Sequence, residues 1–205
     1  MSPRHHPSAE ILAAYAAGVQ EPGFGLVVGA HVETCAQCRA HIGAFEAASG
    51  AALKELPEAD LGADALSRTL ARLETPAPKT VANDTRPLLN RLPLKGKRWV
   101  APGVWVAAVD TPHAPENRVY VLSVPKGMTA ARHEHSGAEY CVVLQGAYHD
   151  ELGAFNAGDF IAAHGDLNHQ PIVDGEEACI CLFATEGRLK PKGWVGRLAF
   201  ALADV

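Results

Sequence analysis

Histidine, glutamate and glycine residues near position 130 have the types and the spacing needed to hold a metal ion. Five residues separate Gly127 from His133, one separates His133 from His135, three lead to Glu139 and six more to Gly146. Alternate side chains of an extended strand share a face, so His133 and His135 are expected to point the same way. After a turn at residues 136–137, Glu139 returns to the same centre. Imidazoles with one carboxylate suit Zn, Fe, Mn or Ni, and this mixture alone does not select among them.

A second segment, from Gly158 to His169, can supply a third imidazole from another strand. The two segments resemble the two cupin motifs: residues 127–146 match the first at every defining position, and the second is matched in part. His164, Asp166 and Val173 stand where the family has Pro, Gly and Asn, while the ligand register is kept. The alternative interpretation is a set of exposed histidines at strand ends. The resemblance implies a divalent metal, with Zn²⁺ expected first, held by His133, His135, Glu139 and His169.

One histidine and two cysteines lie within eight residues near the amino terminus. His31 and Cys35 are four residues apart, which places them one above the other on a helix face, and Cys38 follows in a C-x-x-C. Three ligands of this kind suit tetrahedral zinc, which needs a fourth, and His5 and His6 are the upstream candidates. The alternative is a thioredoxin-like redox pair. No βαβ pattern surrounds the cysteines, and the upstream histidine favours a metal.

The order of these ligands in a small all-helical segment resembles that of the zinc-binding anti-sigma factors. Followed by a cupin, it resembles the ChrR-type anti-sigma factors of bacteria, and the resemblance covers nearly the whole chain. In that family the second histidine of such a pair is the ligand, which selects His6 over His5. The resemblance therefore implies Zn²⁺ held by His6, His31, Cys35 and Cys38.

The periodicity of apolar residues changes near the middle of the chain. The first part is typical of helices, expected over 9–17, 24–33, 36–53 and 61–73, the last with Asp60 as its N-cap. From Trp99 onward, short β-branched runs alternate with turns and predict antiparallel strands over 104–109, 118–124, 139–144, 147–151, 159–163 and 178–184. We therefore expect two domains: a small all-α zinc domain (1–75), a Pro-rich linker (76–94) and an all-β, jelly-roll-like cupin sandwich or barrel (95–205).

Composition sets further bounds on function. The 205 residues are 48% hydrophobic and carry a formal net charge of −5, which argues against a DNA-binding surface. Residues 1–10 lack the apolar core of a signal peptide, and the apolar stretch 99–109 is too short to span a bilayer. We therefore expect a soluble, cytoplasmic protein without direct contact to DNA or a membrane.

Three of the five cysteines fall in the predicted strands. Cys141, Cys179 and Cys181 are interpreted as buried small hydrophobes of a reducing compartment. A redox-responsive role for Cys179 and Cys181, which alternate on one strand face, is the alternative.

The resemblance also implies a function. The helical domain would bind an extracytoplasmic-function sigma factor and block its access to RNA polymerase core. Leu66, Leu70 and Leu73 form a stripe that either contacts this partner or packs within the chain. The metal-binding cupin would sense oxidative stress, such as singlet oxygen, and relieve the inhibition. Such a protein is not an enzyme.

Two other functions compete with this one. A metal-dependent cupin dioxygenase or isomerase would need an open metal position and acid–base groups, for which His164 and Glu151 are candidates. A redox-regulated zinc protein that releases zinc when Cys35 and Cys38 are oxidised is a third possibility. The helical zinc motif favours regulation, because a plain cupin enzyme has no use for it.

Overall fold

The computed structural model describes residues 2–74, 86–111, 117–130, 133–134, 137–164, 168–186 and 190–191. Four α-helices come first and antiparallel strands follow, so the predicted order of a helical segment before an all-β part is confirmed among the described residues. The helices are α1 (Ala9–Ala16), α2 (Pro22–Thr34), α3 (Ala36–Lys54) and α4 (Ala65–Leu73).

The first three helices have their expected positions because their ends carry suitable residues. Ser8 caps α1, since its hydroxyl accepts from the backbone N–H of Ile11 at 3.4 Å. Pro22 begins α2, where its missing N–H costs no helical hydrogen bond. Cys35 ends α2 and is the N-cap of α3, which makes the corner between these helices very short.

The fourth helix begins later than the sequence suggested. We expected Asp60 to cap a helix from residue 61, but α4 begins at Ala65 with Asp64 in the N-cap position. Residues 62–65 form a turn instead, in which the N–H of Ala65 bonds to the carbonyl of Gly62 at 2.9 Å. Gly62 explains why α4 begins later than expected, because glycine is poorly tolerated inside a helix.

Six strands form the main antiparallel sheet, in the order β1-β2-β3-β10-β5-β8. They are β1 (Leu94–Ala101), β2 (Val104–Val109), β3 (Asn117–Val124), β10 (Cys179–Glu186), β5 (Glu139–Gln145) and β8 (Phe160–Ala163). A second sheet has the order β11-β4-β9, with β11 (Lys190–Pro191), β4 (His133–Glu134) and β9 (Asn168–His169). The remaining pair is β6 (Ala147–Asp150) with β7 (Gly153–Asn156), and a 3₁₀ turn, η1, spans Leu88–Asn90.

The sequence prediction missed β1, β7 and the shortest strands. β1 lies at the sheet edge, and its first six residues are exposed, several of them charged, so no apolar alternation marks it. Strands β4, β9 and β11 contain two residues each, too few for any periodicity.

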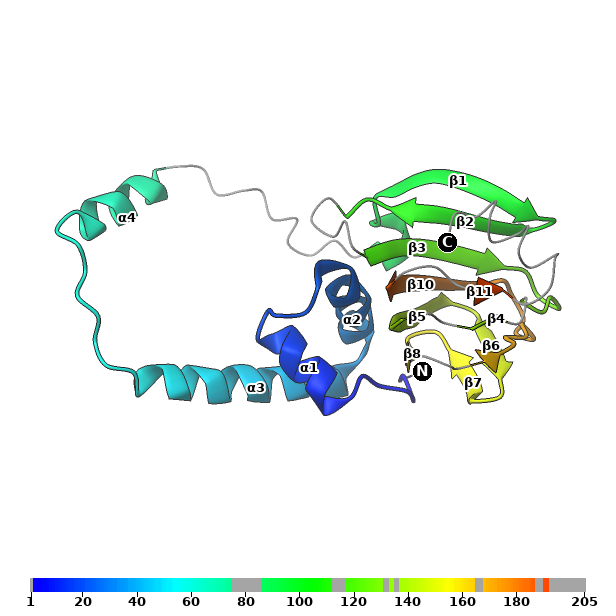
Figure 1. Ribbon diagram of the computed structural model, residues 1–205, viewed down its shortest axis with the longest axis horizontal. Coiled ribbons are helices and arrows are strands. Elements are labelled where there is room, and N and C mark those ends of the chain that lie inside the picture. Colours follow the sequence, from blue (N-terminus) through cyan, green and yellow to red (C-terminus); the bar gives the residue numbers. More distant parts are fainter. Residues whose placement is uncertain are drawn as a thin grey trace.

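The helices and the sheet share one hydrophobic core. Helix α2 contacts β5, β10 and β3 and lies beside the sheet in Figure 1. Phe24 of α2 meets Tyr140 of β5 edge to face, with ring centroids 4.5 Å apart. Val28 and Leu182 are fully buried in the same cluster. The predicted domain boundaries stay a prediction, since the linker residues 75–85 lie outside the described residues.

The far end of α3 and all of α4 extend away from this core (Figure 1). Leu66, Leu70 and Leu73 of α4 are 72%, 53% and 77% exposed, so this stripe does not form an internal core. Among the described residues, no helix combines the length and the apolarity required to cross a membrane.

Candidate metal centre

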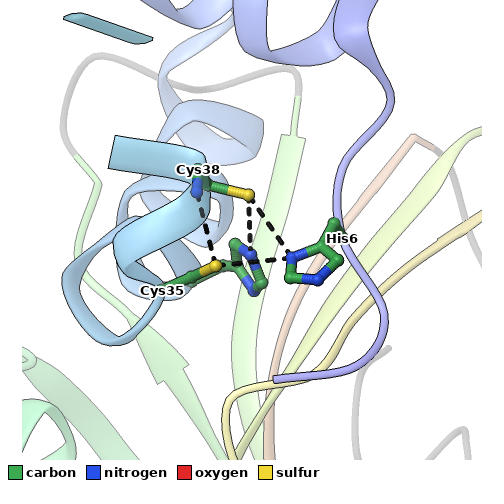
Figure 2. Close-up of side chains that lie close together, drawn as sticks. His6, Cys35 and Cys38 are labelled. Atoms are coloured by element: carbon green, nitrogen blue, oxygen red, sulfur yellow. Dashed lines mark hydrogen bonds between the residues drawn. The ribbon is translucent and has the colours of Figure 1, made fainter. Parts of the chain in front are cut away.

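His6, His31, Cys35 and Cys38 come together at the junction of the helices and the sheet. One ligand atom from each of them lies within 4.8 Å of all the others. His6 Nδ1 lies 3.4 Å from Cys35 Sγ and 3.5 Å from Cys38 Sγ, as Figure 2 shows. His31 Nε2 lies 3.2 Å from Cys38 Sγ. Four donor atoms therefore surround one point.

Each donor is positioned by a separate local feature. His6 comes from the extended segment before α1, and His31 from the last turn of α2. Cys35 occupies the corner, where its sulfur accepts from the N–H of Cys38 at 3.4 Å, and Cys38 lies in the first turn of α3. The short corner brings the sulfurs of Cys35 and Cys38 close to the imidazole of His31, in the last turn of α2.

His31 is held in the tautomer that a metal requires. Its side chain is completely buried, and Nδ1 donates a hydrogen bond to the carbonyl oxygen of Gly158 at 2.7 Å. Because Nδ1 carries the proton, the lone pair of Nε2 is left toward the cysteines. Burial lowers the pKa of His31, which keeps the ring neutral.

Cys38 is a thiol at neutral pH as long as no cation is near. Burial, together with the hydrogen bond and the negative charge of Cys35, raises the pKa of Cys38 to about 12. A bound cation would lower the pKa of Cys38, because it stabilises the thiolate, which is the form that ligates metals.

The two candidate histidines of the amino-terminal pair have different neighbours. His6 faces the cysteines, whereas His5 lies against Asp159, with His5 Nδ1 3.4 Å from Asp159 Oδ2. Asp159 is completely buried. Burial alone would raise the pKa of Asp159, but hydrogen bonds from the backbone of Asn156, His5 and Arg4 outweigh it and lower this pKa.

Three nitrogen–sulfur distances within the cluster are close to those of a tetrahedral zinc site. With Zn–S of about 2.3 Å and Zn–N of about 2.0–2.1 Å, tetrahedral angles place sulfur and nitrogen donors about 3.6 Å apart. The three nitrogen–sulfur distances, 3.2, 3.4 and 3.5 Å, are close to this value. Two thiols and two imidazoles are also a donor set that structural zinc sites use.

The predicted cupin ligands are described in part. His133 of β4 pairs with His169 of β9, so these two positions are direct neighbours across the small sheet. Glu139 begins β5 and is 4% exposed, and His169 is 6% exposed. His135 lies outside the described residues. The buried positions of Glu139 and His169 contrast with the alternative of exposed strand-end residues.

Asp150, at the end of β6, supports His169. Its Oδ2 accepts a hydrogen bond from His169 Nδ1 at 2.7 Å, and its side chain is 1% exposed. A carboxylate in this position fixes a histidine ring with Nε2 available, the arrangement typical of metal-ligating histidines.

The three remaining cysteines lie in one buried apolar cluster of the barrel. Cys141, Cys179 and Cys181 are all buried, and the sulfurs of Cys179 and Cys181 are 3.6 Å apart. The pKa of Cys141 is raised, first by burial and further by the negative charges of Glu139 and Asp150. These thiols therefore share the interior with the predicted cupin ligands.

The two polar groups considered for an enzyme, His164 and Glu151, lie in different places. His164 is exposed and lines a cleft of about 660 Å³ between α1, α2 and the barrel, together with Glu21 and Glu186. Glu151 is exposed, and its Oε2 accepts from the backbone N–H of Gln170 at 3.0 Å. The two groups therefore have separate surroundings.

Sequence reasoning missed Asp150, Asp159 and the contact of Gly158 with His31. Asp150 bonds to a residue 19 positions away, and Gly158 to one 127 positions away. No local spacing connects such pairs. The cupin motif did include Gly158, but gave no sign that it contacts the helices.

Comparison with known proteins agrees with this arrangement. Residues 95–189 match the family described as the ChrR cupin-like domain. The chain is 35% identical over 207 residues to the anti-sigma-E factor ChrR of Cereibacter sphaeroides, with 97% of each chain covered. A crystal structure of Rhodobacter sphaeroides SigE in complex with the anti-sigma ChrR matches with a TM-score of 0.77 and 35% identity, covering 90% of this chain and 100% of that chain. Since the likeness extends over both the helices and the barrel, the chain belongs to the ChrR family of anti-sigma factors.

Proposed function

We propose that this protein binds an extracytoplasmic-function sigma factor and blocks its access to RNA polymerase core. The observation that carries the proposal is the 35% identity, over 97% of the chain, to an anti-sigma factor. The related ChrR structure is a complex with SigE, so a sigma factor is the partner class expected here. Such an inhibitor would act in the cytoplasm, where the polymerase is.

The exposed face of α4 is the contact surface that the structure favours. Leu66, Leu70 and Leu73 lie on one side of this helix and are all exposed. Leu53, Leu56 and Leu61, in and after the end of α3, are also exposed, at 67%, 62% and 83%. Exposed apolar side chains that share one helix face, as on α4, are typical of protein-binding sites. The net charge of −5 suits a partner with basic, nucleic-acid-binding surfaces.

The amino-terminal centre would hold a structural Zn²⁺ through His6, His31, Cys35 and Cys38. When bound, zinc cross-links the segment before α1 to the α2–α3 corner and so contributes folding free energy. The cysteine pair and the buried, neutral His31 supply suitable donors that already lie close together.

The cupin part would hold a second divalent ion, with Zn²⁺ expected first, through His133, His135, Glu139 and His169. We propose that this part senses oxidative stress and ends the inhibition. The buried thiols of Cys179 and Cys181, 3.6 Å apart, are oxidisable groups in the interior of the same barrel. The alternative of a cupin enzyme is not adopted, because the relative that spans the whole chain is an anti-sigma factor.

The test measures binding of the full chain to the sigma factors of its host. We expect Leu70→Asp to weaken binding of the cognate sigma factor at least tenfold, since a charge on the apolar stripe would have to be desolvated. Arg68→Gln, on the opposite side of α4, is the matched control and should bind normally. Failure of the unchanged protein to bind any sigma factor would overturn the proposed function.

A further inference from the structure

We propose that the turn at residues 157–160, which leads into β8 of the barrel, is a positioning element for the amino-terminal zinc centre. Gly158 holds the imidazole of His31, and Asp159 holds the backbone that leads to His6, so retention of zinc depends on this turn. This inference rests on the proposed zinc at His6, His31, Cys35 and Cys38.

Asp159 anchors the segment that carries His6. Its Oδ1 accepts hydrogen bonds from the backbone N–H groups of Arg4 at 2.5 Å and His5 at 2.9 Å. The N–H of Phe160 bonds in turn to the carbonyl of His5 at 3.1 Å. Three backbone groups directly before His6 are therefore fixed to one turn of the barrel. This segment precedes α1 and has no helical hydrogen bonds of its own to set its course.

Gly158 sets the ring of His31 and allows the helices to approach. Its carbonyl accepts from His31 Nδ1 at 2.7 Å. A Cβ at this position would lie 2.9 Å from Pro3 Cγ and 3.2 Å from Thr34 Oγ1. Pro3 precedes His6 and Thr34 precedes Cys35, so the chain on both sides of the centre is packed onto this glycine. Its φ of +93° is a further reason why glycine stands here.

The turn is itself fixed to the main sheet. The N–H of Gly158 bonds to the carbonyl of Val143 at 2.8 Å, and the N–H of Val143 bonds to the carbonyl of Asp159 at 3.1 Å. Asp159 Oδ2 also accepts from the N–H of Asn156 at 2.8 Å. Val143 belongs to β5, the strand that begins with Glu139, a predicted cupin ligand. The support for the imidazoles is thus part of the barrel, whereas the cysteines are positioned by the α2–α3 corner.

The test compares the rate of zinc transfer from the full-length protein to a chromogenic chelator. Loss of a group that orients metal ligands through hydrogen bonds lowers metal affinity roughly 10–100-fold. We therefore expect Asp159→Ala to release zinc roughly 10–100-fold faster. Asp159→Asn should be intermediate, because its amide oxygen can still accept from the N–H groups of Arg4 and His5. Asp174→Asn is the matched control, since Asp174 is exposed on the barrel and pairs with His149, and it should release zinc at the original rate.

A second comparison separates positioning from a general loss of stability. Phe24→Ala weakens the contact between helices and sheet without touching the turn. If Asp159→Asn and Phe24→Ala lose equal unfolding stability, only Asp159→Asn should release zinc faster. Equal release rates for these two, or an unchanged rate in Asp159→Ala, would overturn the inference. A wild-type chain that retains no amino-terminal zinc would instead overturn the proposed metal function.

Discussion

His31 Nδ1 donates a hydrogen bond to the carbonyl oxygen of Gly158, 2.7 Å away and 127 residues later in the chain. This bond joins the candidate metal centre at the amino terminus to the glycine of the second cupin motif. Both groups are removed from water, so neither can exchange this partner for a solvent molecule without opening the junction. The helices and the barrel are therefore joined at His31 as well as through their shared apolar core.

Removing a ligand of the amino-terminal centre should remove one metal ion. We expect His6→Ala and Cys35→Ser each to lose about one zinc equivalent per chain, because three donors hold structural zinc less well than four. His41→Ala, on the exposed face of α3, is the control and should keep its zinc. Elemental analysis of the purified full chain measures the result, and zinc retained in His6→Ala would exclude His6 as a ligand.

Zinc binding to the metal-free chain should release protons. Because burial raises the pKa of Cys38 to about 12, this residue is a thiol at neutral pH and must lose its proton to ligate. The affinity for zinc should then rise with pH, by about tenfold per unit for each proton released. Calorimetric titrations in two buffers of different ionisation enthalpy measure the number of protons. A heat that does not depend on the buffer would contradict the prediction.

The cupin site should lose its metal independently of the amino-terminal one. We expect His169→Ala and Glu139→Gln to remove the second metal equivalent, and Asp150→Asn to weaken its binding roughly 10–100-fold. The reason for the last effect is the 2.7 Å hydrogen bond between Asp150 and His169. Metal content after dialysis against a weak chelator gives the answer. A normal second equivalent in both His169→Ala and Glu139→Gln would disprove the predicted ligand set.

Phe24→Ala should destabilise the protein by about 3–5 kcal/mol, because it leaves a cavity between α2 and the sheet. Phe24 is 3% exposed and contacts Tyr140 of β5. Leu53→Ala is the comparison, since Leu53 is 67% exposed and its loss should change stability by less than about 0.5 kcal/mol. Denaturant unfolding followed by far-UV circular dichroism measures both. Similar stabilities for the two variants would mean that the helices do not depend on this contact.

Much of the fold could be predicted because its causes are local. Apolar spacing of a helix and alternation of a strand are written within a few neighbouring residues, which is why α1 to α3 and strands such as β2, β5 and β10 lie close to their expected positions. The same holds for the pairing of His31 with Cys35 and Cys38, which a single helix corner brings together. The predicted start of α4 was wrong because Gly62 disfavours a helix directly after the expected cap, Asp60.

The sequence by itself therefore determined which residue types are available and which near neighbours share a face. Only the tertiary structure decided that His6 faces the cysteines while His5 lies against Asp159, and that Asp150 supports His169. These choices depend on buried polar groups finding partners, and a partner inside a folded chain can lie at any sequence distance. Asp159 accepts from backbone groups 154 and 155 residues away, and packing of the helices onto the sheet is what brings them within reach.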